Sequence, residues 1–129
     1  ANTPAVFSVY ATLLTLQWLK KQGEIAGIEK INNAKANLLY SEIDRNPYFT
    51  GLAKAEDRSN MNATFKLVNE EHTGVFDALW KEAGINGITG YRTLGGYRAS
   101  MYNALPLESV QVLVDVMQDF ETKVNEIEI

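Results

Sequence analysis

The sequence predicts an α+β fold in which helices flank a small antiparallel or mixed sheet, preceded by a long N-terminal helix. Three observations lead to this class. Apolar residues recur at helical spacing in several long segments, shorter segments have the two-residue period of strands, and the two kinds of segment do not alternate regularly. Regular alternation of strand and helix would instead predict a parallel sheet.

Two helices are expected in the first part of the chain, at residues 4–22 and 24–44. Thr3 is a typical helix N-cap and stands directly before the first apolar-periodic segment. Gly23 suits the left-handed position that ends a helix. Asn46-Pro47 stops the second helix, because the residue before a proline disfavours helical geometry.

The rest of the chain is expected to mix strands and helices. Residues 48–52 resemble a short strand, and residues 61–67 form the clearest strand, since apolar and polar side chains alternate there. A third helix is expected from Asn69 to about residue 83. The sequence further predicts a short helix at residues 98–104 and a last helix that starts at Pro106.

Composition and charge argue against several classes of protein. The net charge of −4 lacks the basic footprint of nucleic-acid-binding domains. No apolar run approaches the roughly 18 residues of a membrane helix, and no signal peptide opens the chain. The absence of cysteine excludes disulfides and thiolate metal sites. We therefore expect a cytoplasmic protein that binds neither nucleic acid nor membranes.

Two arginines among glycines form the first candidate site. Arg92 and Arg98 lie on either side of Gly95-Gly96. Glycines let a backbone approach a ligand closely, and the planar guanidinium of arginine matches a carboxylate or phosphate in a bidentate manner. The segment therefore indicates a small-anion site. The alternative is that Arg92 is a surface residue and Arg98 pairs with a structural carboxylate, and spacing alone favours this alternative.

Asn2 and Thr3 form a second candidate site. A polar pair before a helix offers side-chain donors and unpaired backbone N–H groups beside the positive helix end, which suits a phosphate. The alternative is an ordinary N-cap. His72, the only histidine, lies at the start of a predicted helix. A lone histidine is a weak basis for catalysis or metal binding, so no catalytic residue and no metal site are predicted.

Three blocks of the sequence resemble the phosphoserine aminotransferase family. The most specific is GYRTLGGYRASMYNALPLE at residues 90–108. NTPAVF at residues 2–7 and DRSNMNATF at residues 57–65 are weaker alone and reinforce it. Their order and spacing agree with the family, and the resemblance runs from about residue 2 to residue 120.

The resemblance implies a fold-type-I transferase that depends on pyridoxal phosphate (PLP). The family converts 3-phosphohydroxypyruvate and glutamate into phosphoserine and 2-oxoglutarate in serine biosynthesis, and some members also act in pyridoxine (vitamin B6) biosynthesis. Its members have a large cofactor domain and a smaller C-terminal domain. By position, residues 1–23 would end the large domain and form the connecting helix, and residues 24–129 would be the small domain.

The resemblance also implies roles for individual residues. Arg98 would bind the substrate α-carboxylate, and Arg92 would help bind the distal phosphate or side-chain carboxylate. Asn2 and Thr3 would contact the cofactor phosphate in the partner subunit's active site, which implies a homodimer. Tyr91 stands where many members have histidine. Its hydroxyl would still donate to a substrate phosphate, but without a positive charge.

Transamination needs a lysine that forms a Schiff base with the cofactor. In the family this lysine precedes the Asn-Thr-Pro block, which here means before residue 1. Lys20 and Lys21 do not replace it, because they suit a solvated helix C-terminus. We therefore expect a C-terminal portion that is inactive alone and does not hold PLP covalently. Two other interpretations remain: a stand-alone small-anion-binding or regulatory module, and an interaction domain that dimerises through the first helix.

Overall fold

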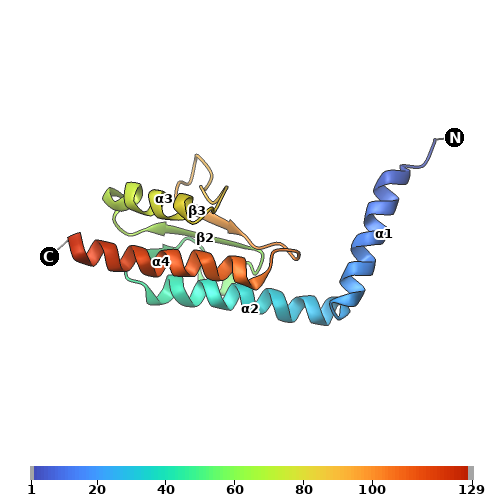
Figure 1. The fold of residues 1–129 in the computed structure, drawn as a ribbon, viewed down its shortest axis with the longest axis horizontal. Coiled ribbons are helices and arrows are strands. Elements are labelled where there is room, and N and C mark those ends of the chain that lie inside the picture. Colours follow the sequence, from blue (N-terminus) through green and yellow to red (C-terminus); the bar gives the residue numbers. More distant parts are fainter. Residues whose placement is uncertain (1, 128–129) are drawn as a thin grey trace. The chain divides into compact units, whose positions relative to one another are not determined.

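A computed structural model describes residues 2–127 of the chain. The chain divides into two compact units, residues 1–31 and residues 32–129. The first contains helix α1 and the start of helix α2, and the second contains the sheet and the remaining helices (Figure 1). The boundary at residue 23 between a large and a small domain stays a prediction.

Helix α1 (Val6–Lys21) confirms the first predicted helix, but it begins later than expected. Its N-cap is Ala5, which makes no side-chain capping bond, so the prediction that Thr3 caps this helix is wrong. The backbone N–H of Val6 donates to the carbonyl of Pro4 instead, at 2.9 Å. No residue of α1 is buried, and apolar side chains such as Phe7, which is 84% exposed, lie open.

Helix α2 (Glu24–Arg45) confirms the second predicted helix. Between the two helices, Gly23 has a φ of 89°, the left-handed conformation that the sequence predicted there. Within the residues that the structure describes, no helix is both long and apolar enough to cross a membrane.

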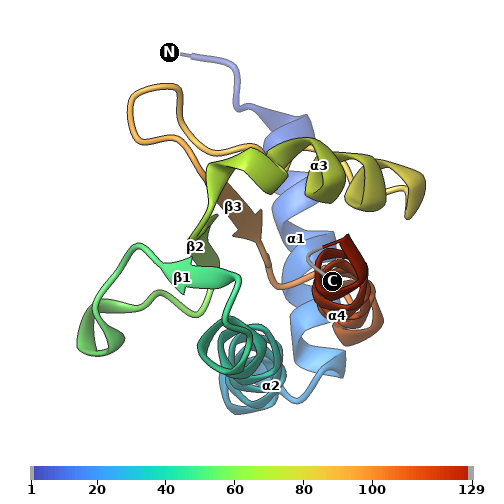
Figure 2. The ribbon, with the colours of Figure 1, turned by 90° about the vertical axis from the view of Figure 1, so that its left-hand side faces the viewer.

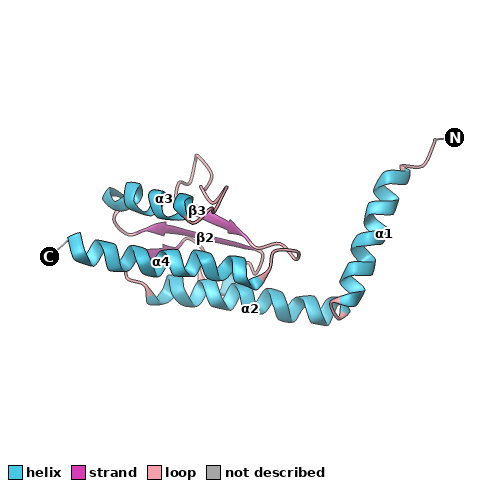
Figure 3. Ribbon diagram, in the orientation of Figure 1, coloured by secondary structure: helices cyan, strands magenta, loops and turns pink. Residues whose placement is uncertain are grey.

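The second unit is built around one antiparallel sheet with the strand order β1-β2-β3. Helices α3 and α4 and the remainder of α2 complete this unit (Figure 3), together with two short 3₁₀ helices. The elements after α2 are β1 (Phe49–Gly51), a 3₁₀ helix (Ala55–Asp57), β2 (Asn62–Leu67), a 3₁₀ helix (Glu70–His72), α3 (Thr73–Glu82), β3 (Tyr97–Ser100) and α4 (Leu107–Ile127). This arrangement confirms the predicted α+β class and its small sheet.

The core lies between one face of the sheet and the helices of the second unit (Figure 2). Alternate side chains of β2 and β3 are buried there, as the strand pattern requires. Four phenylalanines from β1, β2, α3 and α4 meet at its centre, at ring separations between 5.1 and 6.5 Å: Phe49, Phe65, Phe76 and Phe120. The opposite face of the sheet therefore carries the polar side chains, which are half-buried except for the exposed Lys66.

The predicted short helix at residues 98–104 is wrong, because this segment begins as the strand β3. Tyr97 and Ala99 point into the core, while Arg98 pairs with Thr64 of β2 across the polar face. The Ala, Met and Arg residues of the segment favour a helix locally, but pairing with β2 and burial of alternate side chains override that preference. The correction places Arg98 on the polar face of a sheet.

Candidate functional site

The segment before β3 is a tight hairpin whose shape depends on two glycines. Gly90 donates its N–H to the carbonyl of Gly96 at 2.9 Å. A Cβ atom on Gly90 would lie 2.4 Å from the Gly95 carbonyl oxygen, and one on Gly96 would lie 2.6 Å from that of Phe65. Gly96 also has a φ of 67°. These glycines therefore allow close backbone packing within the protein, whereas the sequence suggested close approach to a ligand.

The backbone of Arg98 is held by a hydrogen bond, whereas its guanidinium group has few contacts. Its backbone N–H donates to the carbonyl of Ile88 at 2.6 Å. Its guanidinium carbon lies 4.9 Å from the centre of the Tyr91 ring. The Nε atom of Arg98 is buried and has no hydrogen-bond partner among the described residues. The described part of the chain thus leaves this donor unsatisfied, as it does Nε of Arg58.

Arg92 and Tyr91 lie in the exposed turn at the hairpin tip. The backbone N–H groups of Leu94 and Gly95 both donate to the carbonyl of Tyr91, at 3.0 and 2.8 Å, and these bonds close the turn. Within residues 2–127, neither Arg92 nor Arg98 forms an ion pair with a carboxylate. The structure therefore brings Tyr91 into contact with Arg98 and leaves both arginines without a negative partner in the described part of the chain.

The other two arginines are paired. Arg58 donates both terminal nitrogens to Asp44, at 2.7 and 2.6 Å, and its guanidinium also lies over the Tyr40 ring. Arg45 donates to Glu42 at 2.7 Å and to Glu121 at 2.5 Å. Accordingly, the hydrogen bonds from Arg58 lower the pKa of the Asp44 carboxyl. Only the two arginines of the hairpin segment are left for an anion, among the residues described here.

The polar face beside Arg98 contains hydroxyl and amide groups. Ser100 Oγ donates to Asn62 Oδ1 at 2.9 Å, and Thr64 lies directly opposite Arg98. None of the strand residues on this face is acidic. The face thus combines a positive charge with neutral hydrogen-bonding groups, which suits an anion.

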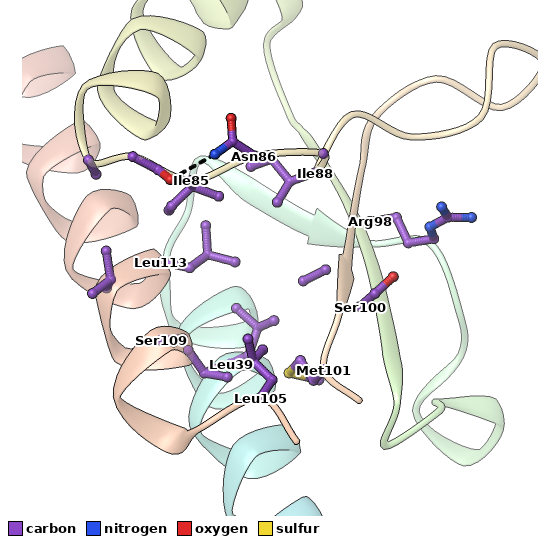
Figure 4. A pocket seen from close by; sticks show the side chains of 16 residues that line it. Leu39, Ile85, Asn86, Ile88, Arg98, Ser100, Met101, Leu105, Ser109 and Leu113 are labelled. Carbon is purple, nitrogen blue, oxygen red and sulfur yellow. Dashed lines mark hydrogen bonds between the residues drawn. The ribbon is translucent and has the colours of Figure 1, made fainter. Parts of the chain in front are cut away.

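A cleft of about 380 Å³ opens on the other side of β3. Apolar side chains such as Leu39, Leu105 and Leu113 converge in it, whereas Arg98 points away from them (Figure 4). The cleft is therefore lined mainly by apolar side chains, and the charged head of Arg98 belongs to the polar face.

Sequence reasoning missed Lys35, which holds the segment that follows β3. This lysine is fully buried and donates to the carbonyls of Met101, Tyr102 and Leu105, at 3.1, 2.8 and 3.1 Å. Burial lowers the pKa of Lys35. A signal was present in the sequence, because Lys35 lies four residues before Leu39 on the apolar stripe of its helix. Lys35 anchors one end of the strand that carries Arg98.

Tyr97 anchors the other end of β3. Its ring stacks on Phe65 at 5.5 Å, and its hydroxyl donates to Asp77 Oδ1 at 2.9 Å. Burial and the bond to Asp77 raise the pKa of this phenol. Tyr97 and Lys35 together hold the backbone on both sides of Arg98, so the arginine stands on a rigid base.

The remaining candidates lie elsewhere. Asn2 and Thr3 are exposed in the segment before α1, in the first unit. His72 is half-buried, and its ring packs edge-on against Tyr48 and Phe120 at 6.4 and 6.3 Å. Across residues 2–127, no group of three or more His, Asp or Glu side chains is arranged to hold a metal ion.

Comparison with known proteins supplies the family. Residues 1–113 match the class-V aminotransferases. The chain belongs to this family. It is 71% identical, over 95% of its length, to a phosphoserine aminotransferase of Flavobacterium psychrophilum, and it covers 35% of that protein.

Solved structures of class-V aminotransferases share the fold. The phosphoserine aminotransferase of Bacillus circulans subsp. alkalophilus matches with a TM-score of 0.88 and 37% identity, over 95% of this chain and 34% of the other. A PLP-bound phosphoserine aminotransferase from Trichomonas vaginalis matches with a TM-score of 0.81 and 32% identity, over 91% and 34% of the two chains. The resemblance stated from the sequence blocks is thereby confirmed. The chain spans about a third of the length of these relatives.

Proposed function

We propose that this chain is the substrate-binding portion of a phosphoserine aminotransferase, which transfers an amino group between glutamate and 3-phosphohydroxypyruvate in serine biosynthesis. The observation that carries the proposal is the absence of carboxylate partners for Arg92 and Arg98 among the described residues, whereas Arg45 and Arg58 are both paired. The matched relatives, which are phosphoserine aminotransferases, support it. A cytoplasmic location is part of the same proposal.

In this proposal the two arginines bind the two ends of the substrate. Arg98, held by β3, binds the α-carboxylate, because a guanidinium without a protein partner can donate two parallel hydrogen bonds to it. Arg92, at the hairpin tip, binds the distal phosphate of the phosphorylated substrate or the side-chain carboxylate of glutamate. Arg98 stands on a strand that is anchored at both ends, and Arg92 lies in an exposed turn. One site can therefore accept either the distal phosphate or the smaller carboxylate of glutamate.

The segment before α1 fits a phosphate group. Asn2 and Thr3 are exposed, neither caps the helix, and the first turn of α1 contains no acidic residue. The unpaired N–H groups of a helix start favour an anion. These two residues would hold the phosphate of PLP in the active site of a partner subunit, in a homodimer. When bound, PLP supplies the electron sink for amino transfer.

None of the described lysines suits the Schiff base. Lys35 is the only buried one among them, and three carbonyls already accept from its ammonium group, which has three donors in all. Lys20 and Lys21 are exposed in the last turn of α1. We therefore propose that this chain alone transfers no amino group. Mixing it with PLP, glutamate and 3-phosphohydroxypyruvate should yield no phosphoserine, and any measurable yield would contradict this part of the proposal.

The binding role is tested on the chain itself. O-Phospho-L-serine is titrated into ¹⁵N-labelled wild-type chain and into the variants Arg98→Ala and Lys123→Ala. Lys123 is exposed on α4, so its variant loses one positive charge away from the hairpin. We expect saturable shifts at residues 91–98 in the wild type and in Lys123→Ala, and their loss in Arg98→Ala. Equal shifts in all three proteins would contradict the proposed function.

A further inference from the structure

Tyr91 has an unusual environment for a large aromatic side chain. It is 67% exposed, and the one ring contact it makes within residues 2–127 is with the Arg98 guanidinium, at 4.9 Å. Its hydroxyl makes no hydrogen bond in the same part of the chain. The ring is therefore not needed to fill the core, and its contact with Arg98 needs another explanation.

The hairpin holds this contact in place from both sides. Tyr91 belongs to the turn that closes on its own carbonyl, and Arg98 is bonded through its backbone to Ile88. The bond between Gly90 and Gly96 fixes the two arms at the base of the turn. The ring and the guanidinium are thus brought together by backbone geometry.

A ring beneath a guanidinium limits its movement without using its hydrogen bonds. The attraction between a cation and an aromatic face amounts to about 0.5–1 kcal/mol at exposed sites and increases when water is excluded. The N–H donors of the guanidinium stay available to a bidentate partner. A side chain that is held in its binding conformation also loses less entropy when a ligand arrives.

We propose that Tyr91 is a positioning residue, whose ring orients Arg98 for the substrate carboxylate, rather than a group that binds the substrate phosphate through its hydroxyl. This inference rests on the proposed function, because Arg98 must be the carboxylate-binding residue. In this proposal the aromatic ring of Tyr91 orients Arg98 and its hydroxyl does not take part. Phenylalanine can therefore replace Tyr91, and leucine cannot.

The test compares Tyr91→Phe and Tyr91→Leu with a matched control, Tyr102→Leu. Tyr102 is also highly exposed, at 61%, and belongs to the same unit. Two readouts are taken on the ¹⁵N-labelled chain: the proton shift of the Arg98 Nε–H, which an aromatic ring above it displaces, and the dissociation constants of O-phospho-L-serine and inorganic phosphate.

We expect Tyr91→Leu to abolish the ring-induced shift and to weaken O-phospho-L-serine binding about three- to tenfold. Tyr91→Phe should keep the shift and bind within about twofold of the wild type, and Tyr102→Leu should change neither readout. Binding of inorganic phosphate, which contains no carboxylate, should be the same in all variants.

Two results would overturn the inference. If Tyr91→Leu binds as the wild type does, the ring does not position Arg98. If Tyr91→Phe loses as much affinity as Tyr91→Leu, or loses phosphate binding, the hydroxyl contacts the ligand instead. Failure of the wild type to bind O-phospho-L-serine contradicts the proposed function separately. In that case the inference falls with the proposed function, and the Nε–H shift reports only whether the Tyr91 ring contacts Arg98 in solution.

Discussion

The α2 side of the second unit and the hairpin before β3 use the same kind of side chain in opposite ways. Arg58 reaches across to Asp44 and lies over Tyr40, so its charge is neutralised and its head is fixed. Arg98 has an aromatic neighbour but no carboxylate within the described residues, and Arg92 is exposed at the tip. The difference separates a cation that stabilises the fold from the two cations that, in the proposed function, bind a ligand.

This contrast has an energetic basis. A charged hydrogen bond contributes about 1.5–3 kcal/mol to stability, so leaving a half-buried guanidinium without one forgoes stabilisation that the fold could use. Functional sites commonly give up stability in this way for binding. Stability should therefore depend on the paired cations and ligand binding on the unpaired ones. The following predictions test this division, from the largest expected effect to the smallest.

Arg98→Ala should have the largest effect. In an aminotransferase of the relatives' full length that contains this chain, the transition-state stabilisation measured by kcat/KM should fall by about 2–5 kcal/mol, because the substrate carboxylate loses its charged partner. Steady-state kinetics measures the loss, and thermal unfolding should change little. The kcat/KM of Arg98→Lys should lie between those of the wild type and Arg98→Ala, since lysine keeps the charge without the planar guanidinium. A loss of less than about tenfold would make Arg98 structural and remove the contrast.

Lys35→Met should lower the free energy of unfolding by about 3 kcal/mol, because one buried and two partly buried carbonyls lose their donor. Urea denaturation measures this change. Lys30→Met removes an exposed lysine from the same helix and provides the control. Equal stability of the two variants would show that the segment after β3 does not depend on Lys35.

Arg58→Ala should lower the free energy of unfolding by about 1–2 kcal/mol and leave O-phospho-L-serine binding unchanged. Its bidentate partner Asp44 is largely exposed, which limits the loss. A double-mutant cycle with Asp44→Asn isolates the pair. Weaker ligand binding in Arg58→Ala would contradict the proposal that one pair of arginines stabilises the fold and the other binds the ligand.

Acidification should lower the free energy of unfolding by protonating Glu42, the partner of Arg45, and this is the smallest of the expected effects. Burial acts to raise the pKa of this carboxyl, but hydrogen bonds from Arg45, Asn46 and Gln118 outweigh it, so the pKa is lowered. A carboxyl with a lowered folded pKa stabilises the fold above its unfolded pKa, and this contribution disappears as the pH falls through the folded value. Urea unfolding at a series of acidic pH values should show the decline, and Glu42→Gln should flatten it.

The sequence predicted the features that depend on local pattern. Helical spacing placed α1, α2 and α4, and alternation placed β2 with its buried face. The residue types around Gly95-Gly96 also predicted a small-anion site, which stays a prediction. Each of these depends on neighbours within a few residues, where spacing determines which side chains share a face.

The features that the sequence did not predict depend on distant partners. Residues 98–100 form a strand only because β2 lies beside them. Lys35 is buried because three carbonyls from 66 to 70 residues away surround it. The contact between Tyr91 and Arg98 likewise requires the turn to be folded. Side chains whose partners lie far along the chain cannot be assigned from periodicity alone.

The two glycines at the base of the hairpin separate a base that tolerates little change from an exposed tip that tolerates more. A side chain at Gly90 or Gly96 would collide with backbone, so the base admits almost no change. The tip at residues 91–94 is exposed and makes few contacts with the core. Under the proposed function, substitutions there would alter which anion is recognised with little effect on folding, so selection could change the substrate range at the tip while the strand beside it stays the same.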